Sequence, residues 1–358
     1  MNINKPNQLV MEAKNLMRFF FLLFFGVLLI FASCVKEGPM GLSGADGVDG
    51  QNGKDGRDGT DGTASCVACH NKTTKALAES QFSVSAHGTM PNKQTRDGCV
   101  ACHSSAGFIE SLTNVSTKTF TALTSSTALK CESCHTSHKT FDFKNDGQDY
   151  ALRTTDPVPL FMDSSIKFDL GTSNLCVNCH QPRSVKPAAN AEGNFVVANI
   201  RFGPHYGTQA VVLQGLWGYH HAQGSTAIPG VGTHAHSRNA SCTSCHMHDG
   251  SGTTGGHTWK VGPQSCNTCH SNITTREAIT ASKASFYELF NQLGDKLLQK
   301  GALRTNASGG LEPNPGTYPI AVAGALFNYR MLYGDHSGGI HNPAYAKALL
   351  RNSIEALN

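Results

Sequence analysis

A five-residue pattern recurs six times in this chain: cysteine, two variable residues, cysteine and histidine. The cysteine pairs are Cys66/Cys69, Cys99/Cys102, Cys131/Cys134, Cys176/Cys179, Cys242/Cys245 and Cys266/Cys269. The histidines that follow them are His70, His103, His135, His180, His246 and His270. C-x-x-C-H is the attachment signature of c-type haem, in which two thiols add to the vinyl groups of one porphyrin and the adjoining imidazole lies under the iron. The pattern therefore predicts six covalently bound haem c groups.

Two other interpretations of paired cysteines are weaker. C-x-x-C units bind zinc in Cys₄ or Cys₂His₂ sites, but zinc binding does not explain why histidine directly follows every second cysteine. The pairs could be disulfides of an exported protein, but a C-x-x-C bridge closes a very small loop and is usually redox-active rather than structural. We therefore keep the haem interpretation and number the sites 1 to 6 in the order of their motifs.

Residues 65–272 carry all six motifs, which leaves little polypeptide for a protein core. We expect the porphyrins themselves to form the apolar core of this hexahaem cytochrome c domain. The motif-bearing stretches are predicted to be single helical turns, and Gly- and Ser-rich connectors such as residues 249–256 are predicted to be loops. The predicted fold is mainly α with much irregular structure, wrapped around haems, preceded by a collagen-like segment and followed by helices.

Residues 273–358 contain no attachment motif and have helical patterns instead. The spacing of apolar residues predicts helices over residues 279–297, 319–333 and 344–357. Gly301 is suited to stop the first helix, while Asn342 and Pro343 are suited to the N-cap and first turn of the last helix. This tail is expected to pack on the haems and to supply one of their ligands.

The N-terminus predicts export and a membrane anchor. Lys14 and Arg18 precede a short apolar run that ends in Phe-Ala-Ser-Cys34, so residues 1–33 read as a signal peptide and residues 34–37 as a lipid-anchor junction. The match resembles a bacterial lipobox, with Cys34 as the lipidated residue. An uncleaved anchor helix is the alternative. The expected location is the outer membrane or cell surface, or otherwise the periplasmic side of a membrane.

Glycine occupies every third position from residue 38 to residue 64. Such a register is typical of a collagen triple helix, because only glycine fits at the axis of three wound chains. The segment also resembles bacterial collagen-like proteins, with aspartate frequent in its triplets. A homotrimer through residues 38–64 and a flexible tether remain open. Both interpretations make the segment a spacer between lipid and haem domain.

The second axial ligand of each iron decides its chemistry. The chain has 17 histidines, so 11 remain outside the motifs for six positions, and histidine is favoured over methionine. His138 follows His135 too closely to reach the same iron and is expected to serve a neighbouring haem. For one position His234 is chosen, with His236 and His221 as close rivals. The expected distal ligands are His87, His138, His205, His234, His257 and His341.

The chain resembles the multihaem cytochromes c of the broad cytochrome c554 and pentahaem nitrite reductase superfamily. The resemblance lies in residues 85–88, 131–138, 242–247 with 256–257, and 337–350. It implies haem pairs stacked in parallel or perpendicular to each other, with distal histidines from these segments. The reductases often carry a lysine in place of one motif histidine, and no Cys-x-x-Cys-Lys occurs here. That departure puts reductase activity in doubt.

Iron with two histidine ligands is closed to substrate and suited to outer-sphere electron transfer. We therefore expect an electron carrier rather than an enzyme, whose partners are a quinol-linked or periplasmic donor and an outer-membrane or extracellular acceptor. A net charge of +4 does not indicate nucleic acid. Two alternatives stay open: a reductase of an oxyanion or nitrogen compound, with Tyr206, Lys260 and Arg201 as proton donors, and a subunit of an extracellular cytochrome filament.

Overall fold

The computed structural model describes residues 64–90, 94–96, 98–113, 127–250 and 252–358. The chain divides into a unit that ends at Thr60 and a unit from Asp61 to Asn358. The expected signal peptide, the junction with Cys34 and the collagen-like segment up to residue 63 lie outside the described residues. Ala64, the last residue of the expected spacer, is the first residue of helix α2.

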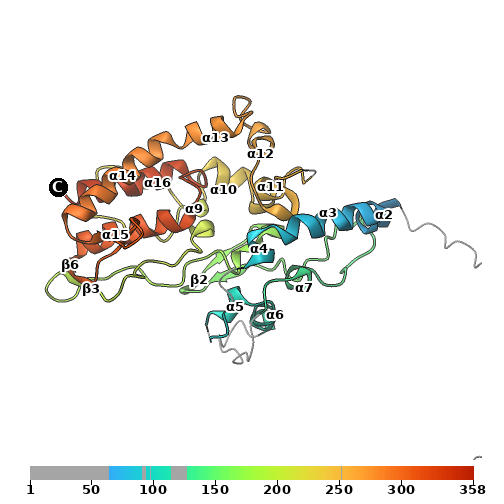
Figure 1. The fold of residues 1–358 in the computed structure, drawn as a ribbon, viewed down its shortest axis with the longest axis horizontal. Helices are drawn as coiled ribbons and strands as arrows, with labels where there is room; N and C mark the ends of the chain where they lie inside the picture. The colour runs from blue at the N-terminus through green and yellow to red at the C-terminus, as the bar shows by residue number, and fades with distance from the viewer. Residues whose placement is uncertain (1–63, 91–93, 97, 114–126, 251) are drawn as a thin grey trace, which may run out of the picture. The chain divides into compact units, whose positions relative to one another are not determined.

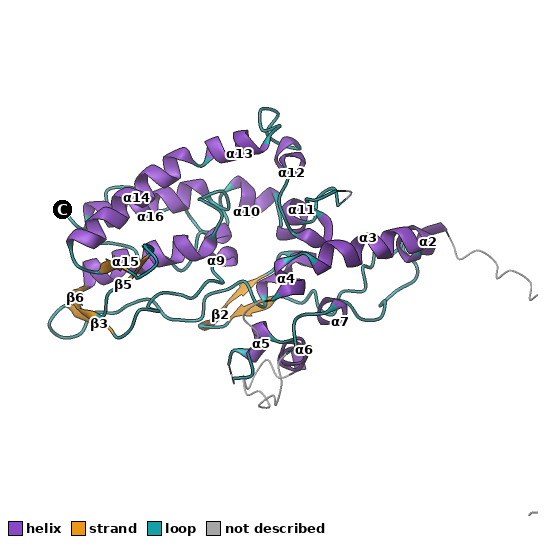
Figure 2. Ribbon diagram, viewed as in Figure 1, coloured by secondary structure: helices purple, strands orange, loops and turns teal. Residues whose placement is uncertain are grey.

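The described part is mainly helical, with long irregular connections (Figures 1 and 2). Its helices before residue 273 are α2 (Ala64–His70), α3 (Lys72–Ser83), α4 (Ala86–Thr89), α5 (Val100–His103), α6 (Ser105–Thr113), α7 (Cys131–Cys134), α8 (Asn174–Val177), α9 (Gln209–Gln214), α10 (Ala235–Asn239), α11 (Cys242–His246) and α12 (Pro263–Asn267). Two 3₁₀ turns, η1 (Gly171–Ser173) and η2 (Gly256–Thr258), lie among them. Each motif thus contains or adjoins a short helix, which confirms the predicted helical turns.

Six short strands form three antiparallel pairs in the described residues. They are β1 (Val158–Leu160) with β2 (Asp163–Phe168), β3 (Asn194–Val197) with β6 (Gly316–Pro319), and β4 (Leu303–Thr305) with β5 (Leu311–Pro313). In the β3–β6 pair, Phe195 lies opposite Tyr318, so a strand of the motif-bearing region pairs with a strand of the tail.

The tail helices are α13 (Arg276–Ser282), α14 (Ala284–Gln299), α15 (Ile320–Asp335) and α16 (Pro343–Glu355). The first predicted helix is in fact two, because the helical path is interrupted at Lys283. The predicted stop at Gly301 is confirmed by its φ of +68°, a value that glycine adopts at little cost. The predicted cap of α16 is also confirmed, since the Asn342 side chain accepts a hydrogen bond from the Tyr345 amide.

Helices α14, α15 and α16 pack together (Figure 1) and contribute many residues to a hydrophobic core of the described part. Buried residues of these helices include Leu293, Phe327 and Leu349. The same core takes in Val177 and Val211 from the motif-bearing region. Apolar side chains of the motif-bearing region therefore pack on the tail helices, and the expectation that porphyrins form the core of residues 65–272 stays a prediction.

Buried polar contacts fix α15 against the motif-bearing region. The Asn328 amide donates to the Tyr219 carbonyl and accepts from the Tyr219 amide, at 2.8 and 2.7 Å. Gly324 lies directly under the Tyr219 ring, where a Cβ would come within 2.2 Å of a ring carbon. These contacts set the position of the C-terminal end of α15, which adjoins the sites described below. No helix in the described ranges is long and apolar enough to cross a bilayer.

Candidate haem sites

Each of the six motif histidines faces a second imidazole from another part of the chain. The ring centroids lie 5.9 Å apart for His70 and His138, 6.1 Å for His103 and His205, 6.1 Å for His135 and His257, 6.1 Å for His180 and His87, 6.3 Å for His246 and His341, and 6.0 Å for His270 and His236. All six pairs join segments that are distant in sequence or belong to different motifs.

This spacing fits a haem iron between the two rings. Metal–imidazole nitrogen bonds are about 2 Å long, so two imidazoles on opposite sides of one iron have centroids roughly 6 Å apart. The six pairs are tilted or edge-on and none is stacked, with interplanar angles from 42° to 86°. The donor set also suits haem c, since two thiols precede the first imidazole of every pair.

The expected distal ligands meet the geometry in five of the six pairs. His87, His138, His205, His257 and His341 each face a motif histidine. The pairing skips along the chain: the histidine ahead of motif 2 faces motif 4, and the one that follows motif 3 faces motif 1. His138 thus lies opposite the histidine of motif 1 and not opposite His135, its neighbour in sequence.

The sixth pair departs from the expectation, because His236 and not His234 faces His270. Helix α10 explains the difference. His234 is its N-cap, and Nδ1 of that ring accepts a hydrogen bond from the His236 amide at 3.1 Å. The His236 ring instead lies toward motif 6, with its Nδ1 donating to the Ile340 carbonyl at 2.7 Å. The third rival, His221, is buried against Tyr219 and near Ser353.

A tight local turn places His87 opposite motif 4. Ser85 is the N-cap of α4, and its hydroxyl accepts a hydrogen bond from the Gly88 amide at 3.0 Å. A Cβ at Gly88 would come within 2.1 Å of the Phe82 carbonyl oxygen, so this turn needs glycine. The Ser-Ala-His-Gly sequence is thus a structural unit that directs one imidazole.

His257 is held in place by Gln81, a buried residue of α3 that lies 176 residues away in sequence. The Gln81 side-chain oxygen accepts from the His257 amide at 3.0 Å, while its amide group donates to the Gly250 and Gly252 carbonyls. Because both ends of the side chain are used, the loop that follows motif 5 is fixed to the helix that follows motif 1. The His257 ring then faces motif 3.

Five paired histidines have Nδ1 at hydrogen-bonding distance from an oxygen acceptor. The acceptors are the Tyr150 carbonyl for His135, Gln209 Oε1 for His180, the Ile340 carbonyl for His236, the Trp259 carbonyl for His246 and Asp335 Oδ1 for His341. A carbonyl or carboxylate oxygen only accepts, so Nδ1 carries the proton in each ring. Nε2 is then left with its lone pair for a metal, the arrangement usual for ligating histidine.

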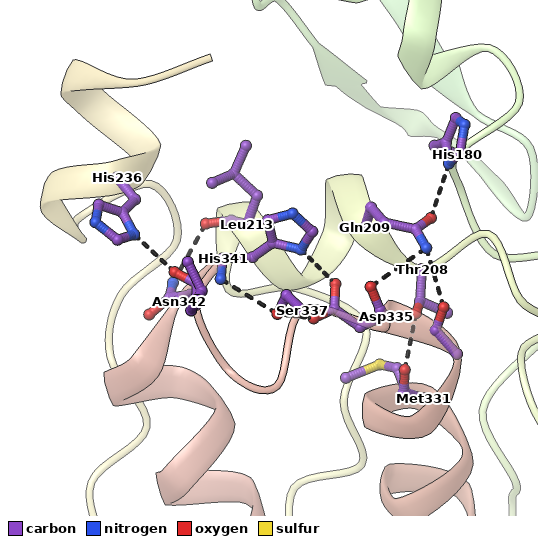
Figure 3. Close-up of polar contacts among 12 residues, drawn as sticks. His180, Thr208, Gln209, Leu213, His236, Met331, Asp335, Ser337, His341 and Asn342 are labelled. Atoms are coloured by element: carbon purple, nitrogen blue, oxygen red, sulfur yellow. Dashed lines mark hydrogen bonds and ion pairs between the residues drawn. The ribbon is translucent and has the colours of Figure 1, made fainter. Parts of the chain in front are cut away.

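The Gln209 amide illustrates how this tautomer is fixed (Figure 3). Its nitrogen donates to the Gly334 carbonyl at 3.0 Å and the Tyr206 carbonyl at 3.1 Å. These carbonyls require the NH₂ group on their side, so the amide oxygen faces His180 Nδ1 at 3.0 Å. Gln209 thereby connects the site 4 ligand to the C-terminal end of α15.

His341 has a charged partner (Figure 3). Its Nδ1 lies 2.6 Å from Asp335 Oδ1, and the Asp335 side chain is 1% exposed. The second carboxylate oxygen accepts a hydrogen bond from the Ser337 hydroxyl, whose oxygen accepts in turn from the His341 amide at 3.3 Å. Burial opposes a charge on His341, but the Asp335 carboxylate outweighs it and raises the pKa of this imidazole above its ordinary value.

Burial lowers the pKa of several other histidines in these pairs. Burial, followed by the charges of His180 and His246, lowers the pKa of His87 to about 4. Burial also lowers the pKa of His180, His205 and His257. A neutral imidazole has the free lone pair that metal coordination needs, so these environments favour ligation at neutral pH.

Contacts between motifs place several attachment points side by side. The Cys179 thiol of motif 4 donates to the carbonyl of Ala101, inside motif 2, at 3.8 Å. The amide of Thr243, inside motif 5, donates to the hydroxyl of Ser173, shortly before motif 4, at 3.2 Å. The backbone of Cys245 accepts a hydrogen bond from Ser265, directly before motif 6, at 2.8 Å. Motifs 2, 4, 5 and 6 are therefore neighbours in that order.

Three attachment cysteines, Cys69, Cys131 and Cys269, are exposed, whereas the other nine motif cysteines are partly buried. The cause is local packing. Cys69 lies on α2, which packs mainly on α3, and Cys269 lies just after α12, which packs mainly on α11, so few other elements cover them. Haem attachment at all twelve thiols stays a prediction that rests on the motifs.

Trp259 connects the motif 3 site to the neighbouring motifs 4 and 5. Its ring lies 4.5 Å from the His87 ring of site 4 and 5.6 Å from the His257 ring of site 3, measured between centroids. Its carbonyl accepts from His246 of site 5 at 2.8 Å. One residue thus contacts imidazoles of three sites. Motif 1 joins through the segment that carries both His135 and His138.

The zinc, disulfide and reductase alternatives have no comparable arrangement of side chains in the described residues. The twelve motif cysteines, all of them within the described residues, form no disulfide. The described ranges also hold no cluster of three or more His, Cys, Asp or Glu side chains placed to bind a metal ion directly. Of the proton donors considered for a reductase, Arg201 and Lys260 are exposed, while Tyr206 stacks on His336 with ring centroids 6.0 Å apart.

Four residues that position the imidazoles were not found from the sequence: Gln81, Gln209, Trp259 and Asp335. Three of them contact histidines that are far away in sequence: Gln81 contacts His257, Gln209 contacts His180 and Trp259 contacts His87. Two of them carry a local signal: Asp335, at the end of α15, comes six residues before His341, and Trp259 comes two residues after His257.

No protein-family profile matches the sequence. The chain is 27% identical over 348 residues to the C-type polyheme cytochrome OmcC of Geobacter sulfurreducens, an alignment that covers 75% of this chain and 44% of the relative. It is 28% identical over 289 residues to the C-type polyheme cytochrome OmcB of the same species, covering 63% of this chain and 37% of OmcB. The chain therefore spans less than half the length of these relatives.

A crystal structure of the outer cell wall cytochrome OcwA aligns with a TM-score of 0.47 and 19% identity, over 78% of this chain and 50% of OcwA. Both sequence relatives are named as C-type polyheme cytochromes, and neither name indicates the cytochrome c554 and pentahaem nitrite reductase superfamily. Together with six attachment motifs, each faced by a second imidazole, they support the identification of this chain as a multihaem c-type cytochrome.

Proposed function

We propose that this protein carries electrons through a relay of six bis-histidine haems. The observation that carries the proposal is the common ring spacing of 5.9 to 6.3 Å at all six motifs. The proposed proximal ligands are the motif histidines, and the proposed distal ligands are His87, His138, His205, His236, His257 and His341. When bound, each haem supplies a one-electron couple between ferric and ferrous iron.

The protein's own residues favour electron transfer over substrate chemistry. A second imidazole at every motif closes the sixth coordination position, so no site is left open for an oxyanion. The neighbouring motifs 2, 4, 5 and 6, with motif 3 beside site 4, bring the redox centres close enough for a relay with site 4 as a branch point. The reductase alternative requires one of these pairs to open.

The N-terminal predictions complete the proposal. Lipidation at Cys34 anchors the protein to a membrane, and residues 38–64 act as a spacer between lipid and haem domain. This arrangement suits a protein that receives electrons from a membrane or periplasmic donor and delivers them to an acceptor at the outer membrane or outside the cell. The collagen-like register leaves trimer and tether as the two forms of the spacer.

Mass spectrometry and EPR spectroscopy of the purified protein test the proposal. The intact mass is expected to exceed the polypeptide mass by six covalent haems, and the oxidised protein is expected to show six low-spin ferric centres. Peptide mapping should find thioether links at the exposed thiols Cys69, Cys131 and Cys269 as well as at the nine partly buried ones. Fewer haems would remove the corresponding sites. A stoichiometric high-spin signal would identify an open iron and favour the reductase.

A further inference from the structure

Site 5 differs from its neighbours in the charge of the groups that hold its ligands. His341 Nδ1 contacts the Asp335 carboxylate at 2.6 Å, whereas His246 Nδ1 contacts the neutral Trp259 carbonyl at 2.8 Å. In site 4, His180 Nδ1 contacts the neutral Gln209 amide, and in site 6, His236 Nδ1 contacts the neutral Ile340 carbonyl. Asp335 is thus a formal negative charge bonded to a proposed haem ligand.

The Asp335 carboxylate is shielded from water. Its side chain is 1% exposed, and its two oxygens are used by His341 and by the Ser337 hydroxyl. The backbone carbonyl of Asp335 is held as well, because Gln209 donates to it at 3.4 Å. Solvent therefore screens the charge little, and its effect falls on the His341 imidazole (Figure 3).

A carboxylate bonded to Nδ1 makes an imidazole a stronger electron donor through Nε2. A stronger donor and a nearby negative charge both stabilise ferric iron more than ferrous iron, since the ferric form carries one more positive charge. Neutral acceptors, such as those at sites 4 and 6, have a smaller effect of the same sign.

We propose that Asp335 is a positioning residue that lowers the reduction potential of the site 5 haem, and so makes site 5 harder to reduce than it would be with a neutral partner for His341. The proposal rests on the bis-histidine ligation proposed above. Because site 5 lies between sites 4 and 6, its potential sets how readily electrons pass between these two sites.

The test uses the full-length holoprotein. His341→Met first assigns site 5, because replacement of one imidazole should change one low-spin EPR signal of the six. Asp335→Asn then removes the charge while keeping an oxygen that can accept from His341 Nδ1. A redox titration that follows the assigned signal should show its midpoint raised by at least a tenfold change in the ferric/ferrous equilibrium, about 59 mV for a one-electron couple.

Asp295→Asn is the matched control. The Asp295 carboxylate is exposed on α14, and its replacement changes the net charge by the same amount as Asp335→Asn. It should leave the site 5 midpoint unchanged. Ser337→Ala provides a second variant with the opposite sign: without the hydroxyl donor, the carboxylate keeps more charge for His341, and the site 5 midpoint should fall. This variant also serves if Asp335→Asn yields no folded holoprotein.

Two failures are distinguishable. If His341→Met changes no haem signal, the ligation proposal is wrong for site 5 and this inference goes with it. If His341→Met changes one signal but Asp335→Asn or Ser337→Ala leaves its midpoint unchanged, the ligation stands and the role of Asp335 is refuted. An equal shift in Asp295→Asn would also overturn the proposal, since it would show a general charge effect.

Discussion

Replacing His236 and His234 separately gives the sharpest prediction from the structure, because the two side chains are neighbours with different tasks. The ring of His236 lies 6.0 Å from that of His270, while His234 is the N-cap of α10. His236→Ala should leave site 6 with one imidazole. One ferric haem in six should then change from low spin to high spin, and the other five should stay low spin.

His234→Ala should show the opposite pattern. Loss of an N-cap acceptor costs about 0.5–2 kcal/mol of stability, so α10 should loosen while all six haems remain low spin. The His236 variant also loses the hydrogen bond to Ile340, worth about 1 kcal/mol. The two variants therefore have similar effects on stability, and stability alone cannot account for a difference in spin state.

The assay is quantitative EPR of the oxidised proteins, with spin integration of the high-spin and low-spin signals. Added imidazole should restore the low-spin signal of His236→Ala by filling the vacated position. His221→Ala is a further control, because that ring faces Tyr219 and Ser353. A high-spin signal in His234→Ala, or six low-spin haems in His236→Ala, would refute the assignment of site 6.

Three further predictions concern other parts of the chain. Trp259→Leu removes the ring beside His87 but keeps the backbone carbonyl that holds His246. The EPR signal of site 4 should therefore change, while that of site 5 should persist. An unchanged site 4 signal would contradict a positioning role for the indole. Tyr345→Phe leaves the buried Gly218 amide without its acceptor at 2.7 Å, so the free energy of unfolding in guanidinium should fall by about 1–3 kcal/mol; an unchanged value would mean that another group satisfies the amide. Deleting residues 38–64 should reduce the oligomeric mass in solution to one third if the segment trimerises, and a mass that reports a monomer before and after deletion would leave the tether.

Local sequence signals predicted local structure well. The N-cap and proline at the start of α16, and the glycine at the end of α14, act within one helical turn, so a short window contains the whole cause. The break at Lys283 was missed because apolar residues continue with helical spacing on both sides of it. Periodicity reports the buried face and not the continuity of hydrogen bonds.

Some candidate distal histidines could be picked out because short local motifs surround them. The turn around His87 and the cap beside His341 leave recognisable residues, so these positions stood out. His234 and His236 are both histidines in one short segment, and only the direction of α10 decides which ring faces motif 6. Nothing in that segment alone distinguishes an N-cap from a metal ligand.

The burial of the attachment thiols could not be predicted from the motif. Cys69 and Cys269 occupy the same motif position as Cys179, yet the first two are exposed and the third is partly buried beside Ala101. The five-residue pattern is identical in each case, so the difference comes from the elements that pack around it.

The sequence by itself determined the number and position of the attachment motifs, because the two thiols and the first imidazole of a haem c site must be adjacent in the chain. Only the tertiary structure decided which second imidazole faces which motif and which group holds its Nδ1. Those partners come from segments as far apart as His87 and His180, or His246 and His341. The remaining coordination position of such a haem can take an imidazole from any segment that packing brings opposite the motif histidine, so the pairing follows from how helices and loops pack and not from their order along the chain.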